Sequence, residues 1–271
     1  NNPARVTPAE RLLLMPAERY DVIVDFSAYA GKTLTLTNDA PIPYPGGLPV
    51  DPNTTAQIMQ FVVSATPVAD TTCDPAVSGS CSLRATRIVR LAKPAKGTLA
   101  SGVVPDKVRQ LVLIENGTAN GPLEVLLNNT KWSGIKESTM PPRGSTLSPV
   151  ADSEPLAGTW ATELPRVGST EVWEIINTTE DAHPIHLHLL QFQIMNRQSF
   201  DNTPGTGYLD TWTAALTAAG LGMGDGPPNP YNTPNADGAV GGNLAISPFL
   251  IAGTMTTPKN YERGWKDTVF T

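Results

Sequence analysis

All three histidines of the chain lie in one window of six residues, His183–His188, with the sequence HPIHLH. Scattered core or surface histidines would not be expected to gather in this way. Neutral imidazole binds copper, zinc, iron and nickel, so the window indicates a metal site without deciding the metal. A blue-copper centre also needs a cysteine thiolate, which this window does not contain. Histidines that bind no metal and a single zinc site are the alternatives.

The spacing within the window separates one histidine from the other two. Side chains alternate between the two faces of a strand, so His186 and His188 are predicted to point to the same side. They would then lie close enough to share one site or to bind two adjacent ions. His183 has the opposite parity, and Pro184, which cannot donate to a strand ladder, stands between them. We therefore expect His183 to face a different metal centre.

Short alternating segments on both sides of the window predict an all-β protein. Turn signals such as Ala30-Gly31 and Asn116-Gly117 separate these segments. Many short strands joined by turns favour a β-sandwich or a barrel. The expected strands are Tyr20–Phe26, Thr33–Thr37, Gln57–Val63, Arg109–Glu115, Leu123–Leu127, Thr170–Asn177 and Ile185–Met195.

The composition excludes several classes of protein. Lys and Arg number 19 and Asp and Glu 25, so the net charge of −6 argues against a nucleic-acid-binding surface. No run of about 18 apolar residues is present, which argues against a transmembrane helix. A chain of 271 residues predicts two domains or one large one, because domains average roughly 150 residues.

Two segments interrupt the strand pattern. Lys93–Gly97 is typical of a linker and places a domain boundary near residues 92–107. Residues 199–258 form a long insertion rich in Gly, Pro and Asn, in which Asp210 is expected to N-cap a short helix that stops at Gly222. Loops of such length are usually functional or partly disordered. The insertion either borders a binding site or is a passive surface excursion.

Cys73 and Cys81 are the only cysteines, and they lie eight positions apart in a polar, turn-rich segment. Their sulfur atoms could meet across a surface loop, and a disulfide would favour an oxidising compartment. Two free surface thiols are the alternative. A metal site is disfavoured because no histidine or second cysteine pair lies nearby.

The histidine window resembles a copper motif of the multicopper oxidases. The similarity is greatest to the bacterial branch that contains spore-coat laccases, bilirubin oxidases and phenoxazinone synthases. It covers most of the chain apart from the insertion at 199–258. The supporting segments are Glu171–Asn177, Pro16–Phe26, Leu126–Asn129 and Gly264–Thr268.

This resemblance implies a domain organisation. Family members stack three cupredoxin domains, so the chain is expected to hold tandem cupredoxin-like Greek-key β-sandwiches, both incomplete at the chain ends. Residues 1–91 would be the C-terminal part of the second cupredoxin domain. Residues 92–271 would be the third domain without its C-terminal copper-ligand segment. The chain is thus expected to be a fragment or one piece of a nicked protein.

The resemblance also implies ligand roles. His183 would bind the type 1 copper and face the substrate, His186 would bind the type 2 copper, and His188 would bind one copper of the binuclear type 3 centre. The family needs two further His-x-His pairs from a first domain and a C-terminal His-Cys-His segment, expected beyond Thr271. The remaining segments of the same oxidase would therefore be the partners of this chain and would share its copper centres.

The implied activity is that of a laccase, bilirubin oxidase or phenoxazinone synthase once the missing segments are supplied. Such an enzyme couples one-electron oxidation of phenolic or other aromatic donors to four-electron reduction of dioxygen to water. The alternatives are a non-catalytic copper-binding cupredoxin fragment and a single-zinc β-sandwich enzyme using a carboxylate such as Asp181. Neither a nucleic acid nor a membrane is expected as a partner. An extracellular, spore-surface or cell-surface location is expected, with the cytoplasm as the alternative.

Overall fold

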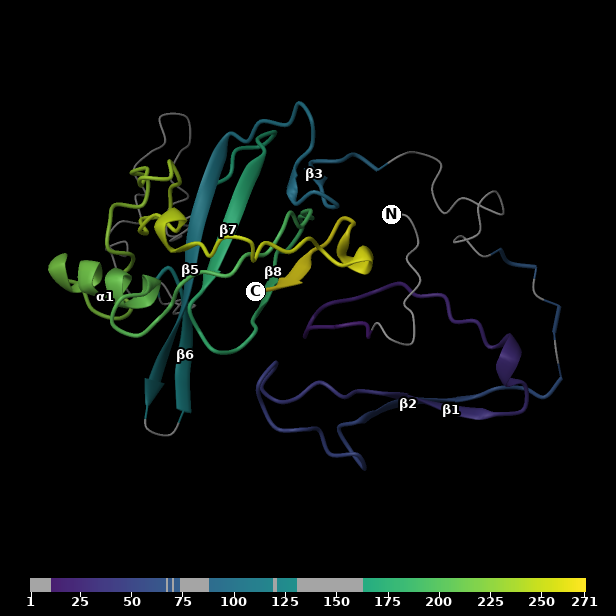
Figure 1. Cartoon of the computed structure of the whole chain (residues 1–271). Coiled ribbons are helices and arrows are strands. Elements are labelled where there is room, and N and C mark those ends of the chain that lie inside the picture. Colours follow the sequence, from purple (N-terminus) through teal and green to yellow (C-terminus); the bar gives the residue numbers. More distant parts are fainter. Residues whose placement is uncertain (1–10, 67, 70, 74–87, 119–120, 131–162) are drawn as a thin grey trace. The chain divides into compact units, whose positions relative to one another are not determined.

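The computed structural model describes residues 11–66, 68–69, 71–73, 88–118, 121–130 and 163–271 (Figure 1). Strands outnumber helices in this part of the chain, which confirms the predicted all-β class and fits the cupredoxin-like sandwich. In chain order the elements are η1 (Ser27–Tyr29), β1 (Thr33–Thr37), β2 (Gln57–Val62), β3 (Ala92–Lys93), β4 (Thr98–Leu99), β5 (Lys107–Thr118), β6 (Gly121–Leu127), β7 (Glu171–Asn177), β8 (Pro184–His186), α1 (Tyr208–Ala218), η2 (Ser247–Phe249), η3 (Asn260–Glu262) and β9 (Thr268–Phe270).

The chain divides into two compact units, and each draws on separate stretches of sequence. The first contains the N-terminal residues up to Arg90 together with 180–194 and 258–270. The second contains residues 91–179 and 195–257. The histidine window therefore belongs to the same unit as the N-terminal strands. The division into cupredoxin domains at residues 91 and 92 stays a prediction.

Two strand pairs organise the first unit. Strand β1 pairs antiparallel with β2, and β8 pairs antiparallel with β9. The expected strand at Tyr20–Phe26 is wrong, because within the described residues no strand pairs with this segment. Val22, Ile23 and Val24 are each more than half exposed. Alternation alone does not make a strand, since a strand is stabilised by hydrogen bonds to a neighbour.

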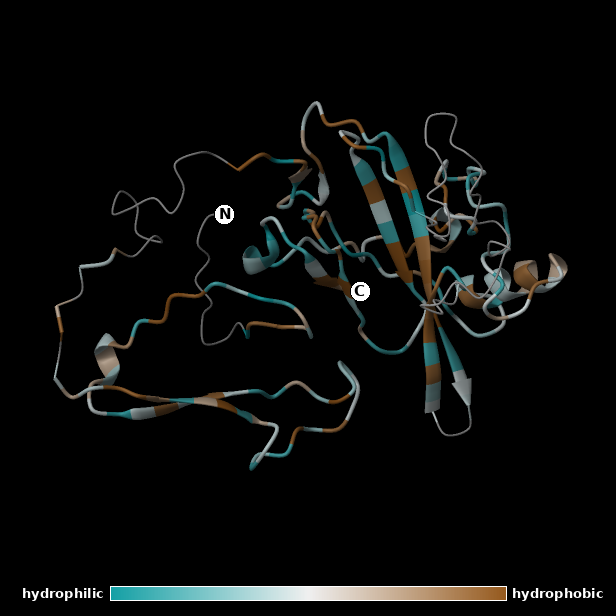
Figure 2. Ribbon diagram, turned by 180° about the vertical axis from the view of Figure 1, so that it is seen from behind, coloured by the Kyte–Doolittle hydropathy of each residue, from teal (hydrophilic) through white to brown (hydrophobic). Residues whose placement is uncertain are grey.

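The second unit is built on a sheet with the strand order β6–β5–β7. Strand β5 pairs antiparallel with β6 and parallel with β7. Figure 2 shows bands of apolar residues along these long strands. The buried core joins Val112, Ile114 and Ile176 of the sheet to Tyr208, Trp212 and Leu216 of α1.

The insertion at 199–258 is therefore not a passive surface excursion. It supplies α1 and the buried Ile246 to the core of the second unit. Its backbone also reaches the sheet, because the Gln110 N–H donates to the Val240 carbonyl at 2.9 Å. Loops of Gly, Pro and Asn separate the apolar residues of this segment, so its sequence shows no clear periodicity. Its apolar side chains nevertheless pack into the core of the second unit.

Two smaller expectations also need correction. Lys93–Gly97 is not a linker, because it lies in the tight connection between the paired strands β3 and β4. Helix α1 begins at Tyr208 after Gly207, so Asp210 lies in the first turn and is not the N-cap. The Asp210 carboxylate instead accepts from the Gly205 N–H at 2.7 Å.

The five remaining strands agree with expectation within a few residues, apart from the longer β5. The expected segments 33–37, 57–63, 109–115, 123–127 and 170–177 correspond to β1, β2, β5, β6 and β7. Cys73 is disulfide-bonded, whereas Cys81 lies outside the described residues, so the Cys73–Cys81 pairing stays a prediction.

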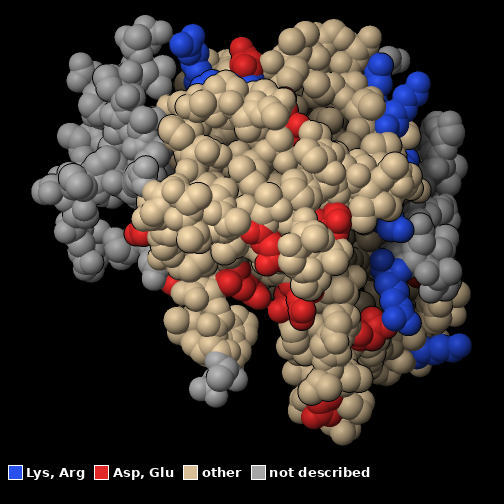
Figure 3. All heavy atoms as spheres, turned by 60° about the vertical axis from the view of Figure 1, so that its left-hand side comes forward, with Lys and Arg blue, Asp and Glu red and all other residues tan. Residues whose placement is uncertain are grey.

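Uncharged residues cover most of the surface seen in Figure 3, with acidic and basic side chains scattered among them. This fits a chain in which charged residues make up only 16%. Within the described residues, no helix combines the length and the apolar character needed to cross a bilayer.

Candidate metal centre

Strand β8 positions the histidine window, and β9 holds β8 in place. Pro184, the first residue of β8, lies opposite Phe270, and His186, the last residue, lies opposite Thr268. A proline is tolerated at the first position of a strand, where its missing N–H leaves no gap in the ladder. The expected strand over Ile185–Met195 is wrong in length, because β8 ends at His186. Leu189 adopts a left-handed φ of 63° and bends the chain away.

The rings of His186 and His188 lie beside each other, as the spacing predicts. Their centroids are 5.0 Å apart and their planes are inclined by 65°. His186 is half-buried and His188 is exposed. His183 precedes β8 and does not line the hollow into which the other two rings open. The structure therefore brings two of the three histidines together and leaves the third outside this hollow.

Hydrogen bonds to Asp267 and Thr268, at the start of β9, determine which nitrogen of His186 can bind a metal. The Nδ1 atom lies 2.8 Å from the carbonyl oxygen of Asp267 and 2.9 Å from Oγ1 of Thr268. A carbonyl oxygen can only accept a hydrogen bond, so Nδ1 must carry the proton. The lone pair of the neutral ring then lies on Nε2, which is the atom left to act as a ligand.

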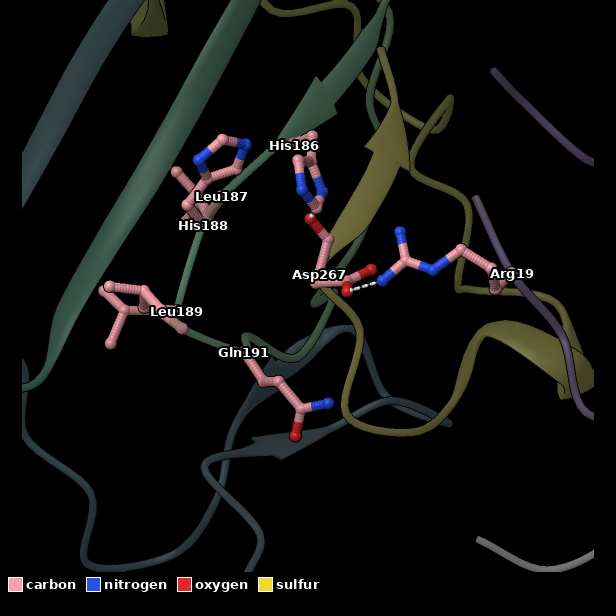
Figure 4. A pocket seen from close by; sticks show the side chains of 8 residues that line it. Arg19, His186, Leu187, His188, Leu189, Gln191 and Asp267 are labelled. Atoms are coloured by element: carbon pink, nitrogen blue, oxygen red, sulfur yellow. Dashed lines mark hydrogen bonds and ion pairs between the residues drawn. The ribbon is translucent and has the colours of Figure 1, made fainter. Parts of the chain in front are cut away.

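An ion pair flanks this histidine. The carboxylate of Asp267 pairs with the guanidinium of Arg19, which reaches toward it in Figure 4. Burial opposes ionisation of this carboxyl, but the hydrogen bond from Thr268 and the Arg19 charge together lower the pKa of Asp267. Asp267 is therefore ionised over the whole neutral range of pH.

The two imidazoles open into a hollow of about 520 Å³. Its rim is apolar, because Leu189 and Leu190 are both exposed. The lining residues are Arg19, His186, Leu187, His188, Leu189, Leu190, Gln191 and Asp267 (Figure 4). Among the residues that the structure describes, no three His, Cys, Asp or Glu side chains converge on one point. The hollow thus offers two imidazoles from this chain to a metal.

Arg19, Asp267 and Thr268 were not predicted as site residues. Their segments supported the family resemblance, but nothing in their local spacing indicated a role. Arg19 and Asp267 are 248 positions apart, and Asp267 follows His186 by 81. The β8–β9 pairing brings Asp267 and Thr268 to the histidine window, and the ion pair with Asp267 holds Arg19 beside them.

A family model described as "Multicopper oxidase" matches residues 126–216, which include the whole histidine window. The chain belongs to the multicopper oxidase family. Membership implies copper as the cofactor, and imidazole nitrogen is a suitable donor for copper.

Curated laccases and a curated multicopper oxidase are similar to the chain. A laccase of Bacillus stratosphericus is 35% identical over 188 residues, which make up 69% of this chain and 28% of the laccase. A laccase of Bacillus subtilis is 36% identical over 191 residues, with the same shares of 69% and 28%. Multicopper oxidase LPR1 of Arabidopsis thaliana is 29% identical over 256 residues, 94% of this chain and 33% of the relative. The chain therefore spans about a third or less of the length of these relatives.

Proposed function

We propose that this chain supplies three histidine ligands to the copper centres of a laccase-type multicopper oxidase. His183 binds the type 1 copper, His186 the type 2 copper, and His188 one copper of the type 3 pair. The observation that carries the proposal is the His186–His188 pair, whose ring centroids are 5.0 Å apart in a segment matched by the family model. The separate position of His183, outside the hollow, supports its assignment to a different centre.

The residues of this chain fit copper by their donor chemistry. His186 presents Nε2, because its Nδ1 is engaged by the Asp267 carbonyl. His188 is exposed at the same hollow and can meet a metal held partly by other ligands. The copper ions, when bound, supply one-electron oxidation of a phenolic or other aromatic donor and reduction of dioxygen to water.

The centres are completed by other segments of the same oxidase, namely a first domain and a C-terminal His-Cys-His segment. In this scheme residues 1–91 belong to the second cupredoxin domain and residues 92–271 to the third. The laccases among the relatives support a laccase rather than a bilirubin oxidase or a phenoxazinone synthase. The disulfide-bonded Cys73 supports an extracellular or surface location, since such bonds persist in oxidising compartments.

Substitution of each histidine by alanine tests the assignment. In the copper-loaded oxidase, His183→Ala should lose the blue absorption band and the oxidation of phenolic donors, while the other coppers remain. His186→Ala should lose the type 2 signal in electron paramagnetic resonance. Gln191→Ala, which alters the lining of the hollow without removing an imidazole, is the matched control and should keep all copper.

Three results would contradict the proposal. Full copper content in all three histidine variants would show that these residues are not ligands. Bound zinc in place of copper would favour a zinc enzyme. Copper binding without any oxidation of phenolic donors by the complete protein would favour a non-catalytic copper protein.

A further inference from the structure

We infer that Arg19, Asp267 and Thr268 are positioning residues that hold the His186 ring with its proton on Nδ1 and thereby aim Nε2 at the metal. This inference rests on the proposed function for the identity of the metal. The arrangement of the hydrogen bonds stands on the structure alone.

The hydrogen-bonding capacity of each group determines the direction of every bond. The Nδ1–H of His186 donates to the Asp267 carbonyl at 2.8 Å and also faces Thr268 Oγ1 at 2.9 Å. Thr268 Oγ1 accepts there, so its own hydrogen is free to be donated. Two acceptors lie within its reach, Oδ1 of Asp267 at 3.1 Å and the Ala17 carbonyl at 3.4 Å. The carboxylate is closer and charged, so it is the stronger acceptor.

The Asp267 carboxylate accepts the hydrogen bond from Thr268 and is paired with the guanidinium of Arg19, which neutralises its charge. Arg19, Asp267 and Thr268 thus form a hydrogen-bond relay that ends at His186. The relay runs from the surface inward: the Arg19 side chain is 63% exposed and that of Asp267 27%, while Thr268 is fully buried. The hydroxyl next to the imidazole is thus shielded from water, which cannot substitute for it. Thr268 is therefore expected to contribute most to the position of the ring, and Arg19 least.

The segment that carries Arg19 is anchored beside β9 by a second ion pair. Glu18, its neighbour, pairs with Lys266, the neighbour of Asp267, and both side chains of this pair are buried. Lys266 also lies 3.9 Å from the centroid of the Tyr20 ring. Two successive residues of one segment therefore pair with two successive residues of the other. This double pairing holds Arg19 in reach of Asp267.

The consequence concerns the ligand atom of His186. A neutral imidazole can carry its proton on either nitrogen, and the partner of one nitrogen decides which of them is free for a metal. Residues that orient a metal-binding histidine in this way typically account for a factor of about 10 to 100 in metal affinity. Loss of the Thr268 hydroxyl should therefore weaken copper binding although Thr268 does not touch the metal.

Nitrogen-15 spectroscopy of the metal-free protein tests the arrangement in the neutral form of the ring, because that form has two tautomers. His186 should appear as a single tautomer with its proton on Nδ1. Thr268→Val has the same shape without the hydroxyl, and it should increase the share of the Nε2–H tautomer. Thr268→Ser should restore the wild-type spectrum. Arg19→Gln, a change at an exposed side chain that leaves the fold intact, should shift the tautomers in the same direction by less.

Copper affinity provides the second measurement, made on the complete oxidase. Thr268→Val should bind copper at the His186 site about tenfold more weakly, and Thr268→Ser should recover the lost affinity. Thr213→Val is the matched control, because this exposed threonine of α1 donates only to a helix carbonyl. It should change neither the tautomer nor the affinity.

Two results would overturn the inference. One is a His186 ring that carries its proton on Nε2 in the wild-type protein. The other is unchanged copper affinity in Thr268→Val when His186→Ala loses copper. If His186→Ala itself keeps all copper, the proposed function fails instead, and the tautomer measurement still tests the relay. The two failures are therefore distinguishable.

Discussion

Breaking the buried ion pair between Arg109 and Glu171 should destabilise the second unit. Arg109 Nε lies 2.6 Å and Nη2 3.0 Å from the two carboxylate oxygens of Glu171. The two side chains are only 2% and 7% exposed. The pair joins the neighbouring strands β5 and β7, and the indole of Trp173 donates to the same carboxylate at 2.9 Å. We predict that Glu171→Gln strongly destabilises this unit.

The expected loss follows from burial of the remaining charge. Removal of one partner of a buried ion pair costs about 3–5 kcal/mol, because the other charge is left without compensation. Glutamine keeps one oxygen for Arg109, so the lower end of this range is expected. Urea unfolding followed by circular dichroism should show a midpoint lower by about 1–3 M, given a slope of about 1–3 kcal/mol/M.

A matched control lies on the same strand. Glu174→Gln makes the same change at an exposed carboxylate and keeps an oxygen for its hydrogen bond from Gln110. It should alter stability by less than about 0.5 kcal/mol. The double variant Arg109→Met with Glu171→Leu should be more stable than Glu171→Gln, because apolar replacement leaves no buried charge. If Glu171→Gln unfolds at the same urea concentration as the control, the reasoning is refuted.

The same pair predicts a dependence of stability on pH. Burial opposes ionisation of Glu171, but the hydrogen bonds from Arg109 and Trp173 and the Arg109 charge lower the pKa of its carboxyl below 4.5. A carboxyl whose pKa is lower in the folded state stabilises the fold above its unfolded pKa, and this contribution is lost as the pH falls through the folded pKa. The urea midpoint of the wild type should therefore decrease below about pH 4.5, and that of Glu171→Gln should decrease less.

Four further substitutions test packing and a second buried ion pair. Gly241→Ala should prevent folding of the second unit, because its Cβ would lie 2.2 Å from a backbone oxygen. Gly238→Ala meets no neighbour within 4 Å and should cost only about 1–2 kcal/mol for its left-handed backbone. Circular dichroism should show an unfolded second unit in the first variant and a folded one in the second. Trp212→Ala, which empties a site that is 1% exposed, should cost about 3–5 kcal/mol in urea unfolding. Glu18→Gln should lower the melting temperature of the first unit because it leaves the buried Lys266 ammonium without a negative charge beside it, and an unchanged melting temperature would contradict this.

Much of the second unit could be predicted from its sequence, because β5 and β7 carry runs of apolar residues, Leu111–Ile114 and Ile175–Ile176, that are typical of strands inside a sheet. The segment Tyr20–Phe26 alternates between apolar and polar residues and is not a strand. The difference lies in the availability of a neighbouring strand, which the local sequence does not describe. The sequence of the insertion at 199–258 misleads in the opposite direction. Its loops have no regular period, yet they carry residues that are buried in the core.

The sequence by itself determined the chemistry of the candidate site. Three histidines at positions 183, 186 and 188 specify imidazole donors, and their two-residue spacing predicted that the last two lie side by side. Only the tertiary structure decided which nitrogen of His186 is free, because its hydrogen-bond partners, Asp267 and Thr268, lie at the start of β9, 81 and 82 residues further along the chain. Spacing within a strand is a local property of the backbone, whereas the partner of an imidazole nitrogen depends on the register between strands that are distant in sequence.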